Sequence, residues 1–246
     1  HILIHRAYHA LPPLKNKKGE LVNAVYGFLL IFFRAIKEFQ PNYIVAAFDT
    51  AKPTFRHVAF KGYKAKRPST PEGLTAQIPK IKAILRKSGI AIFEKEGFEA
   101  DDIIGTIVRR ALDEQEDGGL DVIILSCDLD TLQLVNGDVR VCSLKRGFKD
   151  TILYNEEKVK ESYEILPVNM VDYRALRGDP SDNIPGVAGI GEKTAIKLLK
   201  SFGSLDDIYS EIESATKKSE TINPAIRKKL IKDKELAFLS RELSII

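Results

Sequence analysis

The chain has 246 residues and a mass of 27.5 kDa, a length that suits one large domain or two closely associated ones. Apolar residues make up 44% and charged residues 29%, which fits a soluble globular protein and excludes collagen-like, disulfide-rich and disordered chains. The longest apolar run, near Phe28 to Phe33, is far shorter than the roughly 20 residues of a membrane span, so we expect no membrane partner.

The charges are segregated along the chain although the net charge is only +4. Six Lys and Arg residues and no acid lie between Lys52 and Arg67, whereas Phe93 to Asp102 contains five acids and one Lys. This pattern suits a cationic surface beside an anionic pocket, and it equally suits ordinary solvated helix faces. The two cysteines, Cys127 and Cys142, lack metal-site spacing and are expected to be buried thiols.

The first part of the chain alternates between helical and strand patterns. Helical spacing predicts a long helix over Leu21 to Phe39, and the apolar run from Tyr43 to Phe48 predicts a strand buried on both faces. Thr70, Pro71 and Glu72 predict a helix start, and Gly89 its end.

The same alternation continues to about residue 154. The predicted elements are a strand over Gly89 to Phe93, an amphipathic helix from the acidic turn to Leu112, strands over Val122 to Leu125 and Val139 to Ser143, and a short helix over Leu129 to Val135. We therefore expect an α/β domain over residues 1–154, with a central, mostly parallel sheet and helices on both faces.

After Tyr154 the pattern is helical only, so residues 155–246 are expected to form a helical subdomain. Its segment from Lys217 to Lys234 has seven basic residues, and Pro224 is a predicted helix start.

Carboxylates stand where ligand sites of parallel sheets form, at the carboxyl ends of strands. The set is Asp49, Glu99, Asp101, Asp102, Asp128, Asp130, Asp179 and Asp182. Singly, each cluster also suits a helix N-terminus or an Asx turn. Together they would repel one another unless hard divalent cations neutralise them, and two-metal sites of this kind serve phosphodiester hydrolysis. With the basic surface, this pattern indicates a nucleic-acid substrate.

The segment from Asn183 to Thr194 reads NIPGVAGIGEKT. Gly186, Gly189 and Gly191 allow a tight hairpin whose backbone N–H groups can meet a phosphate, and Lys193 adds charge. The form resembles a helix-hairpin-helix that grips a DNA backbone; the alternative is an ordinary helix-turn-helix core element.

Several motifs together carry a more specific resemblance. They read, in chain order, YIVAAFD, YKAKRP, FEADDIIG, CDLD, GDPSDNIPGVAGIGEKTA and KELAFLSREL. The chain resembles, essentially end to end, the 5′-nuclease (flap endonuclease) domain of bacterial DNA polymerase I. The resemblance implies a PIN-like α/β nuclease core with a helical arch at about residues 50–88, and a helix-hairpin-helix at about residues 183–202. It also implies two-metal-ion cleavage of 5′ flaps and 5′ ends of DNA, and of RNA primers, in replication and repair.

The resemblance also implies roles for individual residues. Asp49, Glu99, Asp101 and Asp102 would form the inner catalytic metal site, and Asp128, Asp130, Asp179 and Asp182 would lie nearer a second metal position. Lys64 and Arg67 of the arch would hold the scissile phosphate, with Arg6 as another phosphate contact. Gly186, Gly189, Gly191 and Lys193 would bind duplex DNA. The implied cofactors are two or three Mg²⁺ ions, for which Mn²⁺ can substitute, and a K⁺ ion at the hairpin.

The implied partners are branched or nicked DNA with a 5′ flap and RNA-primed DNA. We expect a monomer, fused to or acting with a DNA polymerase, at the nucleoid in the cytoplasm. In the family's register His1 directly follows an Asp-Gly motif, so we expect a preceding apolar strand that ends in Asp and lies beside Tyr43 to Phe48. The alternative is a protein that lacks this strand and its metal ligand.

Two other functions remain open from the sequence. A PIN-type ribonuclease would share the carboxylate sheet but lack the arch and hairpin, and a non-catalytic module would bind branched DNA without cutting it.

Overall fold

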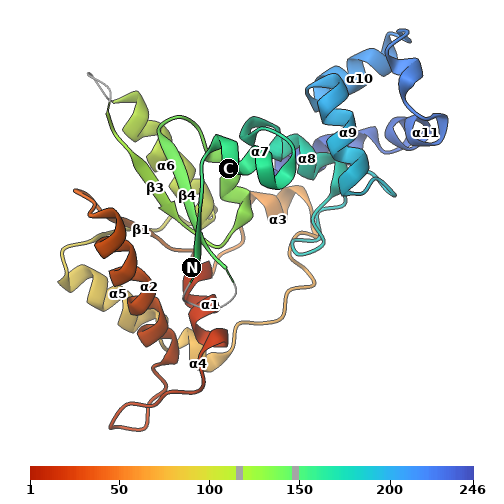
Figure 1. Ribbon diagram of the computed structural model, residues 1–246. Coiled ribbons are helices and arrows are strands. Elements are labelled where there is room, and N and C mark those ends of the chain that lie inside the picture. Colours follow the sequence, from red (N-terminus) through yellow and green to blue (C-terminus); the bar gives the residue numbers. More distant parts are fainter. Residues whose placement is uncertain (115–118, 146–149) are drawn as a thin grey trace. The chain divides into compact units, whose positions relative to one another are not determined.

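The computed structural model describes residues 1–114, 119–145 and 150–246 and contains two compact units (Figure 1). Unit 1 consists of residues 1–54, 68–131 and 138–153, and unit 2 of residues 55–67, 132–137 and 154–246. The units are therefore not continuous in sequence. Residues 55–67, which lie within the predicted arch, pack with the helical C-terminal part of the chain.

The helices and strands before residue 155 follow the predicted alternation. The helices are α1 (Ile2–Ala10), α2 (Asn23–Phe39), α3 (Phe55–Ala59), α4 (Glu72–Thr75), α5 (Ile78–Lys87) and α6 (Ala100–Asp113), with a 3-10 helix η1 (Leu129–Leu134). The strands are β1 (Val45–Ala47), β2 (Ala91–Phe93), β3 (Val122–Leu125), β4 (Val139–Leu144) and β5 (Thr151–Tyr154). The sequence pattern predicted all of these strands except β5.

The strands form two sheets. β1 pairs in parallel with β2, with Val45 opposite Ala91, and β3 pairs in parallel with β4, with Val122 opposite Val139. β5 extends the second sheet beside β4. Parallel pairing agrees with the prediction, but within the described residues no strand joins the two sheets into the single one expected. The expected burial of β1 on both faces is also wrong, because Val45 is 48% exposed.

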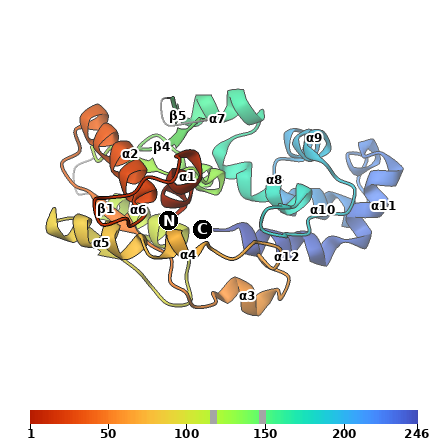
Figure 2. The same cartoon turned by 90° about the horizontal axis from the view of Figure 1, so that it is seen from below.

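The apolar core of unit 1 forms between helices and the first sheet. It comprises Ile4, Ala24, Phe28, Phe48, Leu74, Ile81 and Leu85, with Ala46 and Ile92 packed against it. Helix α1 lies close along α2 in both views (Figures 1 and 2), and Gly27 permits this approach. A Cβ atom at Gly27 would lie 2.9 Å from the Cβ of Ala7, too close for any side chain.

A buried glutamine interrupts the helix predicted between Thr70 and Gly89. Gln77 is fully buried, and its Oε1 accepts hydrogen bonds from the backbone N–H groups of Ala24 (2.8 Å) and Val25 (3.2 Å), at the start of α2. Its Nε2 donates to Gly73 O at 2.8 Å. Gln77 thus caps a helix 53 residues earlier in the chain, and the predicted single helix is instead α4 followed by α5.

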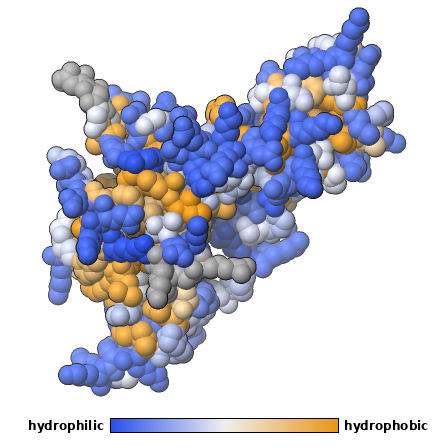
Figure 3. Space-filling view, viewed as in Figure 1, coloured by the Kyte–Doolittle hydropathy of each residue, from blue (hydrophilic) through white to orange (hydrophobic). Residues whose placement is uncertain are grey.

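Apolar side chains also reach the surface of unit 1 over α2 (Figure 3). Tyr26, Leu30 and Phe33 lie on one face of this helix and are each about half exposed. Among the described residues, no helix has both the length and the apolar character needed to span a bilayer.

Unit 2 is built mainly from helices. They are α7 (Glu156–Tyr163), η2 (Pro167–Asn169), α8 (Met170–Arg177), α9 (Glu192–Phe202), α10 (Leu205–Glu213), η3 (Ser219–Thr221), α11 (Pro224–Lys232) and α12 (Lys234–Ser244). Helix α12 packs along α8, and Pro224 is the first residue of α11, as predicted (Figure 2).

Candidate active site

Asp49 is joined to the first turn of α6. It directly follows the segment that contains β1, where Phe48 N donates to Phe93 O at 3.0 Å. Its Oδ1 accepts a hydrogen bond from the backbone N–H of Ala100 at 2.8 Å, and its Oδ2 lies 3.4 Å from Nδ1 of His1. An unpaired N–H at a helix start attracts a carboxylate, so the end of β1 and the start of α6 are held together.

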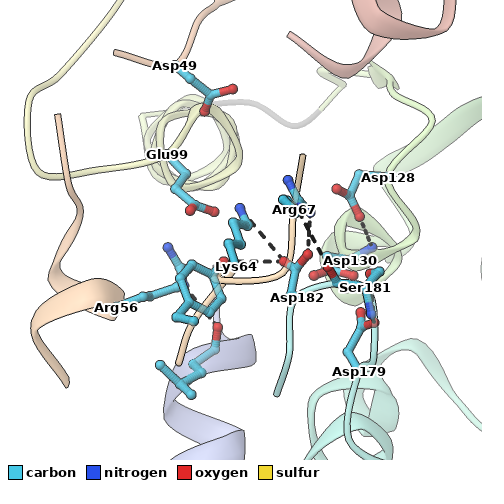
Figure 4. A network of polar contacts seen from close by, with 12 residues as sticks. Asp49, Arg56, Lys64, Arg67, Glu99, Asp128, Asp130, Asp179, Ser181 and Asp182 are labelled. Atoms are coloured by element: carbon cyan, nitrogen blue, oxygen red, sulfur yellow. Dashed lines mark hydrogen bonds and ion pairs between the residues drawn. The ribbon is translucent and has the colours of Figure 1, made fainter. Parts of the chain in front are cut away.

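Glu99 and Asp102 form a capping box at the same helix start. Oδ2 of Asp102 accepts from the backbone N–H of Glu99 at 2.8 Å, and the Glu99 side chain accepts from the backbone N–H of Asp102. Asp101 lies between them in the first turn. The acids therefore stabilise the helix, as the simpler interpretation of this cluster predicted, and they belong to the same helix start as Ala100, whose N–H binds Asp49. Figure 4 shows Asp49 and Glu99 beside α6.

Asp128 and Asp130 follow β3 in a tight turn. Asp128 N donates to Ser126 Oγ at 3.0 Å, and Asp128 Oδ1 accepts from Asp130 N at 3.0 Å (Figure 4). Thr131 Oγ1 donates to Asp128 O at 2.6 Å. These bonds make the Asx turn that loop aspartates commonly form, directly after a strand end.

The donor chemistry of unit 1 fits a hard divalent cation. Asp49, Glu99, Asp101 and Asp102 supply carboxylate oxygens, the ligands that Mg²⁺ and Mn²⁺ prefer, around one helix start. In residues 1–114, 119–145 and 150–246, however, no three acidic, His or Cys side chains come together at metal-binding distance. The structure therefore places the predicted donors near one another but does not gather them into a coordination sphere.

In unit 2 the carboxylate of Asp182 contacts two basic residues of segment 55–67. The Lys64 ammonium lies 3.7 Å from Oδ2, the Arg67 guanidinium pairs with Oδ1, and the Tyr63 hydroxyl donates to Oδ2 at 3.3 Å (Figure 4). Asp182 is only 5% exposed. A predicted metal ligand and two predicted phosphate contacts are thus paired with one another.

The backbone of segment 55–67 supports this pairing. Lys64 N donates to Asp182 O at 2.8 Å, and Asn183 Nδ2 donates to Gly62 O at 2.7 Å. Lys64 has a positive φ of 53° and Asn183 one of 57°, a conformation that is costly for Lys and tolerated by Asn. The hydrogen bonds with Asp182 and Asn183 therefore hold the backbone of Lys64, a predicted phosphate contact, in a strained conformation.

Asp179 is paired with Arg174. The Arg174 guanidinium contacts Oδ2, and Oδ1 accepts from the backbone N–H of Ser181 at 2.8 Å and from its hydroxyl at 2.7 Å. Burial raises the pKa of Asp179, but the Ser181 hydrogen bonds and the Arg174 charge outweigh it and hold the pKa below its usual value. Asp179 is therefore an ionised, tightly bound carboxylate.

Arg56 is a residue whose role the sequence did not reveal. It is buried, and its Nε donates to Leu243 O at 2.9 Å while Nη2 donates to Ile245 O at 2.5 Å. The guanidinium thereby binds the last carbonyl groups of α12, a favourable place for a cation. In the sequence Arg56 is one of six basic residues between Lys52 and Arg67, and nothing there distinguishes this buried arginine from its solvent-exposed neighbours.

The predicted hairpin is the loop 178–191 between α8 and α9. Gly186 and Gly189 have positive φ values of 62° and 73°, and a Cβ at Gly186 would lie 2.3 Å from Gly178 N. Gly191 is the N-cap of α9, and Lys193 is exposed in its first turn. Within the described part of the chain the N–H groups of Gly189 and Gly191 have no hydrogen-bond acceptor. The loop thus presents N–H groups at a helix start, as predicted.

The loop is held by three residues whose role the sequence did not reveal. Gly186 N donates to Ser240 Oγ at 2.9 Å, Ala188 N donates to Asp233 Oδ2 at 3.0 Å, and Lys229 Nζ donates to Gly189 O at 3.1 Å. All three come from α11, α12 or their junction.

Arg6, a predicted phosphate contact, lies on α1. Its guanidinium donates to Lys145 O within unit 1. It also interacts with Cys127: burial raises the pKa of that thiol, and Arg6 partly opposes the shift. Cys142 is buried as predicted, with its pKa raised to about 11 by burial, whereas Cys127 is only half-buried.

Comparison with known proteins gives consistent matches. The family model "5′-3′ exonuclease, N-terminal resolvase-like domain" matches residues 1–164, and "5′-3′ exonuclease, C-terminal SAM fold" matches residues 165–246. DNA polymerase I of Bacillus caldotenax is 43% identical over 242 residues, which is 98% of this chain and 26% of that protein. The chain thus spans about a quarter of the length of the curated relatives it matches.

Solved structures have the same fold. T5 D15 protein co-crystallised with metal ions has a TM-score of 0.77 at 22% identity, over 99% of this chain and 86% of that one. The T5 D15 flap endonuclease in a pseudo-enzyme-product complex with DNA and metal ions has a TM-score of 0.72 at 23% identity, over 89% and 79%. The predicted α/β fold class is confirmed. The chain belongs to the 5′-3′ exonuclease family, whose members are metal-dependent phosphodiester hydrolases, as its motifs predicted.

Proposed function

We propose that this chain is a structure-selective 5′ nuclease that cleaves DNA at 5′ flaps and 5′ ends and removes RNA primers during replication and repair. The observation that carries the proposal is the hydrogen bond from Ala100 N to Asp49 Oδ1. It joins the carboxylate that follows β1 to the acidic first turn of α6, which is the arrangement a phosphodiesterase needs at a strand end.

The metal site is proposed from the same residues. Asp49, Glu99, Asp101 and Asp102 would hold the inner Mg²⁺ or Mn²⁺ ion, and Asp128, Asp130, Asp179 and Asp182 would contribute to a second or third. When bound, such ions supply an activated water and stabilise the charge that develops on the phosphate. Most of these side chains already accept backbone or side-chain hydrogen bonds that fix their orientation.

The basic residues would bind the nucleic acid. Lys64 and Arg67 would hold the scissile phosphate once it competes with Asp182 for them, and Arg6 would contact a neighbouring phosphate. The N–H groups of Gly189 and Gly191, with Lys193, would bind the duplex backbone without reading its sequence. Carbonyl groups in the loop around Gly186 are the proposed ligands of a K⁺ ion.

The proposed organisation follows from these roles. Residues 1–154 would be the nuclease core, including an arch at about 50–88, and residues 155–246 the DNA-binding subdomain. The partners would be branched or nicked DNA with a 5′ flap and RNA-primed DNA, at the bacterial nucleoid in the cytoplasm. The chain would act as a monomer, joined to or working beside a DNA polymerase.

One experiment separates this function from its alternatives. The chain is incubated with a labelled 5′-flap duplex or a single-stranded RNA of equal length, with Mg²⁺ or with EDTA. Mg²⁺-dependent release of the flap supports the proposal. Tight flap binding without cleavage would instead indicate a non-catalytic module, and preferential cleavage of the RNA would indicate a ribonuclease.

A further inference from the structure

Loop 186–190 is held by side chains from the far end of the chain. Ser240, Asp233 and Lys229 bind the backbone at Gly186, Ala188 and Gly189, at distances between 2.9 and 3.1 Å. These contacts span 40 to 54 residues of sequence. Among the described residues these three backbone groups make no backbone–backbone hydrogen bond, so the three side chains supply the partners that regular structure would otherwise provide.

Asp233 is itself fixed at the junction of α11 and α12. Its N–H donates to Lys229 O at 3.0 Å, and its carbonyl accepts from Ala237 N at 2.9 Å. It is 8% exposed. Ser240 is fully buried, and its hydroxyl donates to Leu236 O at 2.6 Å while accepting from Gly186 N. Both acceptors are therefore rigid before any ligand arrives.

The charge of Asp233 is unexpected at this place. It stands in the segment from Lys217 to Lys234, which holds seven basic residues, and beside a loop that we propose binds phosphate. A negative charge there repels the DNA backbone and by itself weakens binding. The same carboxylate accepts the hydrogen bond from Ala188 N, which fixes the loop backbone between Gly186 and Gly189 and so favours binding.

We propose that Asp233 and Ser240, with Lys229, are positioning residues that hold loop 186–190 in its DNA-binding conformation. This inference rests on the proposed function. The N–H groups of Gly189 and Gly191, which have no acceptor in the described part of the chain, are then already oriented for a phosphate before DNA binds. The free-energy cost of ordering the loop therefore does not reduce the affinity. DNA affinity thus depends in part on two buried side chains, those of Asp233 and Ser240, that do not contact DNA themselves.

The test compares four variants of the full chain. Asp233→Ala removes the acceptor and the charge, Asp233→Asn keeps an acceptor oxygen and removes only the charge, and Glu235→Ala removes the charge of an exposed acid two residues away. Ser240→Ala is a second, independent loss of an acceptor. Binding of a labelled, nicked duplex in Ca²⁺ or EDTA is followed by anisotropy over a range of salt concentrations, and thermal unfolding checks each fold.

We expect Asp233→Ala and Ser240→Ala to weaken DNA binding roughly five- to tenfold, whereas Asp233→Asn and Glu235→Ala bind as well as the wild type or more tightly. The salt slope of Asp233→Ala should stay unchanged, because a smaller binding-competent population lowers affinity without removing a phosphate contact. For cleavage, KM should rise while kcat holds.

Amide hydrogen exchange of the free protein gives a readout that needs no DNA. Exchange at Ala188 should accelerate in Asp233→Ala but not in Asp233→Asn. Wild-type exchange at Ala188 in Asp233→Ala, or an equal decrease of affinity in Asp233→Ala and Asp233→Asn, would overturn the inference. If the wild type binds no DNA, the proposed function fails, and the exchange result alone decides whether these side chains order the loop.

Discussion

The Lys64 ammonium lies 3.7 Å from the carboxylate of Asp182, a residue 118 positions later in the chain. Arg67 shares the same carboxylate, and the Lys64 backbone N–H donates to the Asp182 carbonyl. The sequence predicted that Lys64 binds a phosphate and that Asp182 binds a metal ion. In the structure each satisfies the charge of the other, so under the proposed function a substrate phosphate would have to replace Asp182 as the partner of Lys64.

The pairing predicts that Asp182 stabilises unit 2. We expect Asp182→Ala to lower the free energy of unfolding by about 2 kcal/mol, less than a fully buried pair would lose because the Arg67 side chain is 47% exposed. Urea unfolding measures this. Glu161→Ala, which breaks the exposed pair with Lys158, is the control and should cost less than about 0.5 kcal/mol. Equal effects would contradict the structural role of Asp182.

Asp102→Asn should abolish cleavage without unfolding the protein. The asparagine oxygen can still accept the hydrogen bond from Glu99 N, so the helix start survives while the charge of a proposed metal ligand is removed. We expect an unchanged melting temperature, flap binding within a few fold of wild type, and turnover reduced by more than about tenfold in single-turnover assays. Asp182→Asn should reduce turnover less. Retention of more than about a tenth of wild-type turnover by Asp102→Asn would remove Asp102 from the inner site.

The double variant Lys64→Ala with Arg67→Ala should lower turnover far more than duplex affinity. These residues come from segment 55–67 and contact the loop between α8 and α9 at Asp182, whereas the N–H groups that we propose bind the duplex belong to Gly189 and Gly191, near the start of α9. Affinity for a flapless nicked duplex and turnover on a flap substrate measure the two effects. A matching decrease of duplex affinity would show that the basic segment also binds the duplex.

Gly191→Val should, in contrast, lower duplex affinity more than turnover. Gly191 has an ordinary φ of −95° and open space around its missing Cβ, so a valine there is compatible with the fold and obstructs only an incoming ligand. We expect weaker binding of all duplex substrates and a salt slope lower by about one for each phosphate that the variant no longer binds. An unchanged slope would mean that this position does not face DNA.

The pH dependence of stability should reflect Asp172. Burial raises the pKa of this carboxyl, although its Oδ2 accepts a hydrogen bond from Leu205 N at 2.9 Å. A raised pKa means that the folded state favours the protonated form of Asp172. The stability that this protonated carboxyl contributes is therefore complete below its pKa of 3.8 in the unfolded chain, and it is lost as the pH rises through its higher pKa in the folded protein. Asp172→Asn should therefore be more stable than wild type at pH 7, and the gain should vanish near pH 3. A constant gain between pH 3 and pH 7 would contradict this origin.

Local patterns predicted the elements that local forces determine. The apolar spacing of α2 and α6 and the four-residue run of β3 appear in the structure nearly as predicted, because each buries one face or one short segment. The acidic start of α6 was also predicted, since a carboxylate there stabilises the helix whatever else it does.

Contacts between distant residues could not be predicted in this way. The pairing of Asp182 with Lys64, the capping of Leu243 O by Arg56 and the loop contact of Asp233 all depend on which segments meet in the fold. The resemblance assigned Asp182 and Lys64 separate roles, since it carries information on each motif but none on how their charges balance without a ligand.

The capping of α2 by Gln77 has a consequence for the order of folding. The N–H groups of Ala24 and Val25 have their acceptor, Gln77, 53 and 52 residues later in the chain. Helix α2 can therefore form as soon as it is synthesised, but its first turn stays frayed until Gln77 and α5 pack against it. At typical rates of protein synthesis, the intervening residues take roughly 3–10 s to be made. The nascent chain thus passes through a stage in which α2 is helical but its start is uncapped, and a prematurely released fragment that ends before Gln77 remains at that stage.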